Sequence, residues 1–214
     1  VIISLRPPWR QRYTAEHELG HHEYGHGASL DAEMNENTRE EFLANRFARA
    51  LLMPKLTVAN AYQRRGWDPR LTTAEQAFVV AQDLGVGFTT LIDNMSQTLR
   101  LLGRDHAHLL TKLRLAKVRA TVAGHEVEHD FFPVDEQWGK RPLDVQVGDL
   151  IALPAGAVFS GASLGLDAGR ARALRAGRAE LRLRGRGTPI EVRVSRRAFA
   201  GRAKFRHLED PDDE

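Results

Sequence analysis

The feature that most constrains this chain is residues 17–21, His-Glu-Leu-Gly-His, which form an HExxH motif. On a helix, residues four apart project from the same face, so the side chains of His17 and His21 can reach one metal ion. Zinc is bound in this way by neutral imidazoles at about 2.0–2.1 Å, with an open position left for water. Glu18 lies beside that position and is suited to accept a proton from the water. The motif therefore predicts a catalytic metal site on a helix.

A second HExxH copy, His-Glu-Val-Glu-His, occupies residues 125–129. Gly124 precedes it, Pro133 follows, and apolar and polar residues alternate, which favours a strand over a helix. On a strand, His125 and His129 would lie roughly 6.5–7 Å apart on one face, with the glutamates on the other. We therefore predict that this copy is not catalytic.

The sequence around the first copy indicates where its helix begins and ends. Thr14 suits the N-cap position, and Glu16 would place a negative charge in the first turn, where the helix dipole favours it. Gly25 and Gly27 are typical of a helix C-terminus. We expect a short helix that carries both histidines.

A zinc site also needs a third protein ligand, and the next helical segment offers one. That segment begins near Asn37, has apolar residues at helical spacing and ends at Met53-Pro54. We favour Glu41 as the ligand, with Glu40 as a further candidate. However, Thr38-x-x-Glu41 is also a capping box, in which Glu41 would bind the backbone of Thr38 instead. Spacing alone leaves both interpretations open.

Two blocks of this sequence resemble the ImmA/IrrE metallopeptidases. Residues 12–22 read RYTAEHELGHH, which is similar to the family's pattern of Arg, an aromatic residue, Thr and two small or apolar residues before HELGH. Residues 41–54 read EFLANRFARALLMP, which resembles the family's E-x-x-A-N-x-F-A followed by LLMP. One departure is Glu16, which stands where the family usually has a small or apolar residue.

The resemblance implies a zinc-dependent endopeptidase with His17, His21 and Glu41 as zinc ligands and Glu18 as general base. It also decides between the two interpretations of Glu41, because the family's ligand lies three residues before the Ala of its pattern. The implied substrate is a helix-turn-helix transcriptional repressor, cleaved in the cytoplasm to induce stress, mobile-element or defence genes. Family members usually have helical sequence before a strand similar to residues 1–5, so we expect that the chain is N-terminally truncated.

Further residues are candidates for supporting roles. Asn45 lies one turn beyond Glu41 and could bind an imidazole N–H, which would fix the tautomer of a ligand. A peptidase must also stabilise the oxyanion that forms during hydrolysis. The polar side chains available for this task are His22, Tyr24, His26 and Tyr62.

Composition limits the class of protein. The chain has 214 residues, a hydrophobic content of 42% and a mean hydropathy of −0.40, which are typical of a globular protein with two domains. No apolar run approaches the roughly 18–20 residues that a membrane span needs. Cysteine is absent, so a zinc site must use histidine and carboxylate ligands, and the chain suits the cytoplasm.

We predict an α+β chain: a helical zincin-like metallopeptidase domain with a helix-turn-helix-like segment, followed by a small β-rich domain. Residues 1–104 would form the peptidase domain, 105–117 a connecting helix, and 118–214 an Arg-rich sensor or docking domain with an acidic tail. The helix-turn-helix-like segment would begin with a capping box at residues 72–75 and have Gly85 after its first helix.

Local patterns predict the elements of the β-rich domain. Alternating apolar residues indicate a strand at 118–122, and an apolar run indicates another at 150–153. A hairpin is also predicted, in which Leu181 and Leu183 face residues 190–194. Residues 167–176 are interpreted as a short helix.

The alternative function is a non-catalytic DNA- or protein-binding transcriptional regulator. Thr89, Thr90 and Asn94 would lie on the second helix of the helix-turn-helix-like segment, where DNA is read. The arginines of residues 170–202 could also attract nucleic acid. However, several of them fall at the solvent-facing positions of the hairpin, and few aromatic residues are present to stack on bases. DNA binding is therefore not favoured, and Glu18 would have no use in a purely structural metal site.

Overall fold

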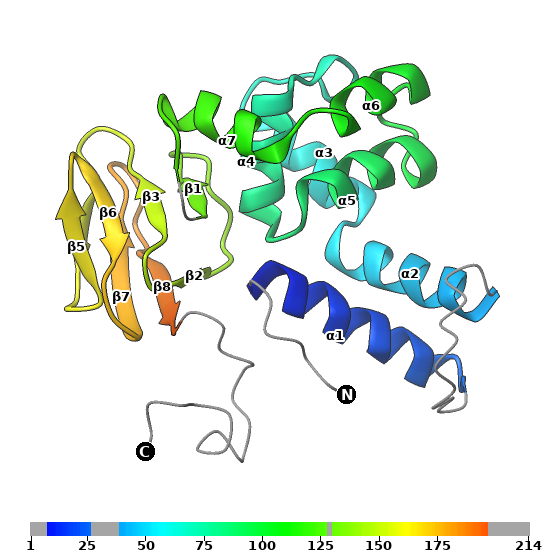
Figure 1. Cartoon of the computed structure of the whole chain (residues 1–214), viewed down its shortest axis with the longest axis horizontal. Helices are drawn as coiled ribbons and strands as arrows, with labels where there is room; N and C mark the ends of the chain where they lie inside the picture. Colours follow the sequence, from blue (N-terminus) through cyan, green and yellow to red (C-terminus); the bar gives the residue numbers. More distant parts are fainter. Residues whose placement is uncertain (1–7, 27–38, 128–129, 197–214) are drawn as a thin grey trace.

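The chain changes from helices to strands after residue 123, and Figure 1 shows the helical part beside the β-rich part. The computed structural model describes residues 8–26, 39–127 and 130–196. The strand predicted at residues 1–5, the caps predicted at Gly27 and Thr38, and the acidic tail lie outside the described residues. The helices are α1 (Pro8–Glu23), α2 (Arg39–Leu52), α3 (Lys55–Gln63), η1 (Pro69–Leu71), α4 (Ala74–Leu84), α5 (Phe88–Asp93), η2 (Asn94–Thr98), α6 (Arg104–Thr111) and α7 (Leu115–Ala123).

The HExxH motif of residues 17–21 lies on α1, as expected, but this helix is longer than predicted. It begins at Pro8, so Thr14 is an interior residue and not the N-cap, and Glu16 is not in the first turn. Proline is favoured at the first helical position because its fixed φ suits a helix and its missing N–H costs nothing there. Gly25, with a φ of 65°, follows the last turn, as the sequence predicted.

Helices α4 and α5 pack together, as predicted for the helix-turn-helix-like segment. Gly85, which follows α4, has the left-handed conformation. The capping box lies one residue later than expected, between Thr73 and Gln76. The second helix is short, because α5 ends at Asp93 and the chain continues only as the π-helical turn η2. Asn94 is 1% exposed and donates to the Met53 carbonyl oxygen at 3.4 Å, so it cannot read DNA from this position.

The connection to the β-rich part differs from the sequence prediction. Two helices, α6 and α7, replace the single connecting helix, and residues 118–122 belong to α7 rather than to a strand. The alternation of Val118 with polar residues reflects one buried face of a short helix, which Gly124 ends with a φ of 76°. In the second HExxH copy, residues 125–127 form neither helix nor strand, and residues 128–129 lie outside the described residues.

Between residues 130 and 196, the β-rich part forms two four-stranded mixed sheets, in the orders β1-β3-β6-β5 and β2-β8-β7-β4. Strands β1 and β3 are parallel, as are β2 and β8, and the other pairs are antiparallel. Buried residues from both sheets form one apolar cluster between them. The strands are β1 (Phe131–Pro133), β2 (Leu143–Gln146), β3 (Leu150–Ala152), β4 (Val158–Ser160), β5 (Leu164–Asp167), β6 (Arg170–Ala173), β7 (Gly177–Arg182) and β8 (Ile190–Ser195).

Two predictions about these strands have different outcomes. The hairpin is confirmed, since Leu181 of β7 lies opposite Ile190 of β8, but Leu183 lies beyond the end of β7, and Ala179 is the residue opposite Val192. The short helix predicted at residues 167–176 is wrong, because this stretch is the turn of the β5–β6 hairpin and strand β6. Ala168 and Gly169 both have positive φ values, 47° and 79°, which is the backbone of a two-residue hairpin turn.

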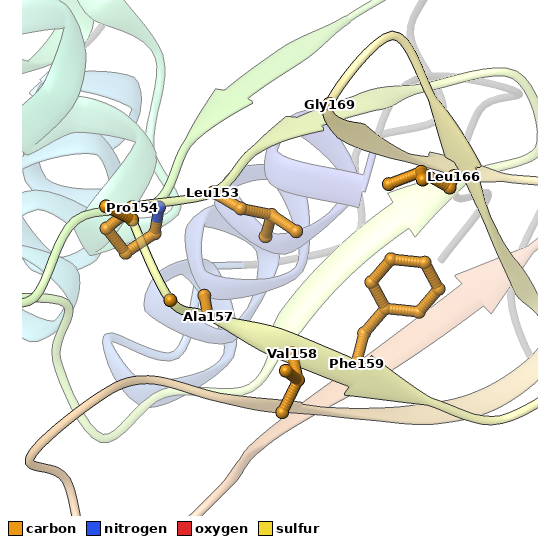
Figure 2. Close-up of a pocket in the computed structure, with 9 residues that line it drawn as sticks. Leu153, Pro154, Ala157, Val158, Phe159, Leu166 and Gly169 are labelled. Carbon is orange, nitrogen blue, oxygen red and sulfur yellow. The ribbon is translucent and has the colours of Figure 1, made fainter.

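A hollow of about 470 Å³ opens on the β-rich part (Figure 2). Its walls are mainly apolar side chains from the β3–β4 connection and from strands β4 and β5, and none of its lining residues belongs to α1 or α2. The hollow is therefore separate from the HExxH motif. No helix in the described ranges combines the length and the apolar character that crossing a membrane requires.

A buried carboxylate joins the helical part to the β-rich part. Asp83, at the end of α4, is 2% exposed and accepts hydrogen bonds from Arg64, from Arg65 at 2.9 Å and from the Gly139 N–H at 2.7 Å. Arg65 also binds both carboxylate oxygens of Asp135, at 2.6 and 2.8 Å. The network fixes the β1–β2 connection against α3 and α4.

The C-terminus of α4 is also held by arginines from both sides. Arg12 of α1 donates to the Leu84 carbonyl oxygen at 3.1 Å, and Arg141 of the β1–β2 connection donates to the carbonyl oxygens of Gln82 and Asp83 at 2.8 and 3.2 Å. Cations are favoured at this end of a helix, where the backbone carbonyls lack intrahelical partners. The helix with the HExxH motif and the β-rich part therefore meet at one helix end.

We expect Asp83→Asn to lower the free energy of unfolding by about 3 kcal/mol. Removing one partner of a buried ion pair typically costs roughly 3–5 kcal/mol, and Arg65 keeps its second partner, Asp135, which favours the lower value. Urea denaturation measures the change. Glu136→Gln, at an exposed neighbouring carboxylate, is the control and should change the stability by less than about 0.5 kcal/mol. Equal stabilities for the two variants would contradict this account of the junction.

Candidate metal centre

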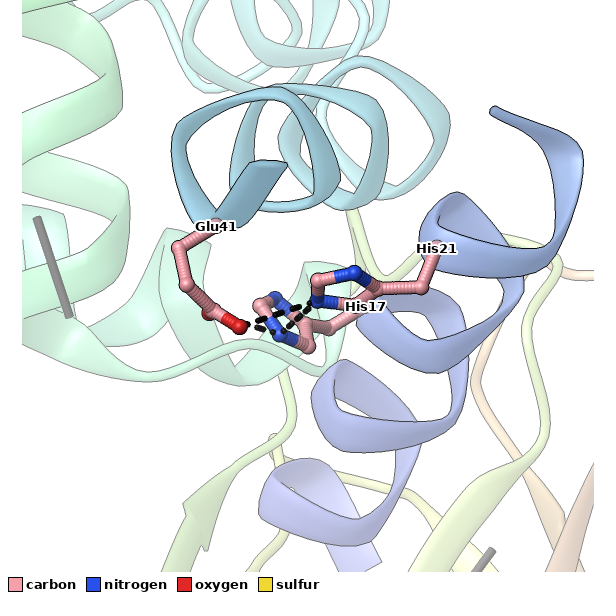
Figure 3. A group of neighbouring side chains, drawn as sticks. All are labelled: His17, His21 and Glu41. Atoms are coloured by element: carbon pink, nitrogen blue, oxygen red, sulfur yellow. Dashed lines mark hydrogen bonds and ion pairs between the residues drawn. The ribbon is translucent and has the colours of Figure 1, made fainter. Parts of the chain in front are cut away.

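Helices α1 and α2 lie side by side and bring three potential metal ligands together (Figure 3). The Nε2 atoms of His17 and His21 lie 3.1 Å apart. The Glu41 carboxylate faces both, with Oε2 3.2 Å from His17 Nε2 and Oε1 3.1 Å from His21 Nε2. The two histidines and Glu41, which the sequence singled out from separate segments, therefore meet at one point.

The close approach of the two helices depends on Gly20, between the two histidines. A Cβ atom at this position would lie 3.0 Å from the Ala44 Cα and 3.1 Å from both the Ala44 carbonyl oxygen and the Phe47 Cβ. Two of these neighbours are backbone atoms of α2, which a side chain at Gly20 could displace only by moving the helix. Glycine here lets α2 come near enough for the Glu41 side chain to reach both imidazoles.

The geometry of the three donors fits a metal ion. In a tetrahedral zinc site with bonds of about 2.0–2.1 Å, neighbouring ligand atoms lie about 3.3 Å apart. The three observed separations of 3.1–3.2 Å are close to this value, and the donor atoms of the group all lie within 4.8 Å of one another. Two imidazole nitrogens and a carboxylate oxygen that face one point repel each other through their lone pairs unless a cation lies between them. The donor set therefore suits a divalent ion.

The outer nitrogen of His17 is held by Asn45. Its Nδ1 atom lies 3.2 Å from the Asn45 Oδ1 atom, which also accepts a hydrogen bond from the Tyr13 hydroxyl at 3.0 Å. An oxygen acceptor at this position requires the proton of a neutral His17 on Nδ1, which leaves the lone pair on Nε2. Tyr13 is an addition to the predicted residues, and its position four residues before His17 on one helix face was the signal.

The outer nitrogen of His21 also has a partner. Its Nδ1 atom lies 3.0 Å from the Nδ1 atom of His26, just beyond the end of α1. Both metal-facing Nε2 atoms thus belong to imidazoles whose opposite nitrogens are engaged. For His26, this contact lies on the far side of the His21 ring from the three converging donors, which differs from the position expected of an oxyanion-binding group.

The other three residues predicted for the oxyanion have different environments. Tyr62 is fully buried in the helical core, where its hydroxyl donates to the Met95 sulfur and accepts from Thr72, and burial raises its pKa to about 12. It cannot contact a substrate, so this prediction is wrong. The His22 side chain is 83% exposed and lies 4.0 Å from Glu23. The Tyr24 ring stacks on the His26 ring, with centroids 5.7 Å apart.

Glu18 follows His17 on α1 and is partly buried. No side chain among the described residues forms a hydrogen bond or an ion pair with its carboxylate. In contrast to Glu41, which faces both histidines, Glu18 is therefore not committed to a partner within the described ranges.

Comparison with known proteins identifies a family that the N-terminal part of the chain resembles. Residues 1–95 match the model of the IrrE N-terminal-like domain, the peptidase M78 family. The match begins before α1 and ends in η2, so it includes both helices of the metal centre and excludes the β-rich part. No curated protein and no solved structure matches the chain. Residues 1–95 are therefore similar to the N-terminal domain of the peptidase M78 family, which supports the resemblance to ImmA/IrrE metallopeptidases found in the sequence.

Proposed function

We propose that this protein is a zincin-like, zinc-dependent endopeptidase in which His17, His21 and Glu41 hold the zinc ion and Glu18 is the general base. The observation that carries the proposal is the convergence of two Nε2 atoms and one carboxylate from two helices at 3.1–3.2 Å. Three protein ligands leave one tetrahedral position for water or substrate, which distinguishes catalytic zinc sites from closed structural ones.

The chain's own residues have separate tasks in this mechanism. A zinc ion held there would polarise the scissile carbonyl and lower the pKa of a water molecule to about 7. Glu18 would take the proton from the attacking water and deliver it to the leaving amine, as the peptide C–N bond breaks. Asn45, itself oriented by the Tyr13 hydroxyl, would keep the proton of His17 on Nδ1 and its ring in place.

The family implies a protein substrate, and we propose that it is a helix-turn-helix transcriptional repressor in the cytoplasm, whose cleavage induces stress, mobile-element or defence genes. Apolar surface on the two helices of the metal centre supports a peptide as the ligand. Leu19 and Phe42, next in sequence to Glu18 and Glu41, are both exposed. Their side chains would contact apolar residues of an extended segment.

Two observations count against a non-catalytic DNA-binding regulator. Asn94 is buried in the core and cannot contact a base. Three arginines of β7 and β8 form ion pairs with glutamates: Arg182 with Glu180 at 3.3 Å, and Arg178 and Arg193 with Glu191 at 3.4 and 2.8 Å. The two glutamates offset part of the positive charge of these arginines, and a phosphate backbone would have to compete with them.

We expect the protein to bind one equivalent of zinc, and Glu41→Gln to weaken its zinc affinity by more than about 100-fold. Losing an outer hydrogen-bond partner of a ligand already costs about 10–100-fold, and Glu41 contacts the ion directly in this account. Competition with a chromophoric chelator measures the affinity. Glu40→Gln is the matched control, because Glu40 is the exposed neighbour on the same helix, and it should bind zinc as the unmodified protein does. A larger loss for Glu40→Gln would reverse the assignment.

We expect Glu18→Gln to retain zinc and to cleave its substrate about 10²–10⁴-fold more slowly, which is the usual contribution of a positioned acid–base group. The zinc-loaded protein and this variant are incubated with the helix-turn-helix repressor encoded beside it, and the fragments are identified by mass spectrometry. Glu16→Gln, on the same helix, controls for loss of a negative charge. Cleavage at the same rate by the unmodified protein and by the Glu18→Gln variant, or cleavage by neither, would contradict the peptidase proposal.

A further inference from the structure

Helix α1 ends in a Schellman turn that folds the chain back over a metal-facing histidine. The His26 N–H donates to the His21 carbonyl oxygen at 3.0 Å, and the Gly25 N–H donates to the His22 carbonyl oxygen at 3.1 Å. Gly25 is the left-handed residue of this turn, with a φ of 65°. The hydrogen bond from His26 to His21 joins the sixth and first residues of the turn. It places His26 directly over His21, because these are the two positions whose side chains contact each other in such a turn.

The side chains at these positions are usually apolar, but here they are two imidazoles. Their Nδ1 atoms lie 3.0 Å apart, their ring centroids are 5.1 Å apart, and the ring planes are inclined by 68°. At this distance one Nδ1 atom donates a hydrogen bond to the other. At the end of α1, a hydrogen bond between two imidazoles thus stands where an apolar contact is usual. This hydrogen bond requires one ring to carry its proton on Nδ1 and the other ring to have a lone pair there.

The other contacts of His21 decide which ring donates. His21 Nε2 faces Glu41 Oε1 and His17 Nε2, where it must present a lone pair to hold a cation. A neutral imidazole has one N–H, so a cation held by His21 Nε2 would place the proton of His21 on Nδ1, where it is donated to His26 Nδ1. His26 then carries its own proton on Nε2.

His26 is itself held in place by aromatic contacts. The Tyr24 ring stacks on it with a centroid separation of 5.7 Å and an interplanar angle of 26°. The edge of Tyr24 meets Phe47 of α2, with centroids 6.1 Å apart and planes at 81°. The helix that supplies Glu41 therefore also braces the residue that contacts His21.

We propose that His26 is a positioning residue, which fixes the tautomer and ring orientation of His21 and so prepares its Nε2 atom for the metal ion. This inference rests on the proposed zinc site. It gives each histidine ligand its own partner, Asn45 for His17 and His26 for His21. It also removes His26 from the groups that contact the substrate.

The test compares zinc affinity in the full chain for His26→Leu and His26→Asn by chelator competition. We expect about 10–100-fold weaker binding for His26→Leu, the usual cost of losing a partner of a ligand. An asparagine oxygen can occupy the place of the Nδ1 acceptor, so His26→Asn should restore most of the affinity. His22→Leu, at the exposed neighbour, should bind as the unmodified protein does. Imidazole ¹⁵N spectra of the unmodified zinc-loaded protein should show the His21 proton on Nδ1.

The outcomes separate this inference from the proposed function. Zinc binding by the unmodified protein together with an unchanged His26→Leu affinity would overturn the role of His26 alone. Equal losses of zinc affinity in His26→Leu and His26→Asn, or a His21 proton on Nε2, would show that His26 only packs against His21. Either result would also overturn the positioning role of His26. Absence of zinc binding in the unmodified protein would overturn both proposals. Thermal unfolding of each variant, matched to the unmodified protein, confirms that folding is intact.

Discussion

The close crossing of α1 and α2 at Gly20 and Ala44 is the constraint on which the metal centre depends. HExxH on a single helix supplies only two ligands. The third must come from another helix, which has to lie at a fixed distance from the two histidines and at their level along α1. Because Gly20 has no side chain, the backbone of α2 approaches α1 between the two histidines, and Glu41 reaches both of them. A larger residue would have to move α2, and the carboxylate with it.

The same crossing organises the hydrogen bonds behind the ligands. Asn45 lies one turn after Glu41 on α2 and holds His17, while Phe47 supports Tyr24, which stacks on His26 at the end of α1. The imidazoles are thus oriented by groups from both helices. Fixing ligands in this way reduces the entropy that is lost on metal binding, and it directs the lone pairs to one point.

Sequence patterns predicted the local features well and the long-range ones poorly. The HExxH helix, the left-handed Gly85 and the β7–β8 hairpin follow from short-range spacing and turn chemistry, and the structure has all three. The strand predicted at 118–122 failed because four or five alternating residues also fit one face of a short helix. Contacts between distant segments, such as Gly20 with Ala44 or Asp83 with Gly139, have no local signal. The resemblance to a family, rather than spacing, decided the role of Glu41 over its capping box with Thr38.

The position of the bound ion tests the central claim most directly. Crystals of the zinc-loaded protein, measured at the zinc absorption edge, locate the metal by anomalous scattering without reference to activity. We expect one strong peak within about 2.0–2.2 Å of His17 Nε2, His21 Nε2 and a Glu41 carboxylate oxygen. A zinc ion bound elsewhere, or bound by the two histidines with Glu41 turned away, would contradict the account.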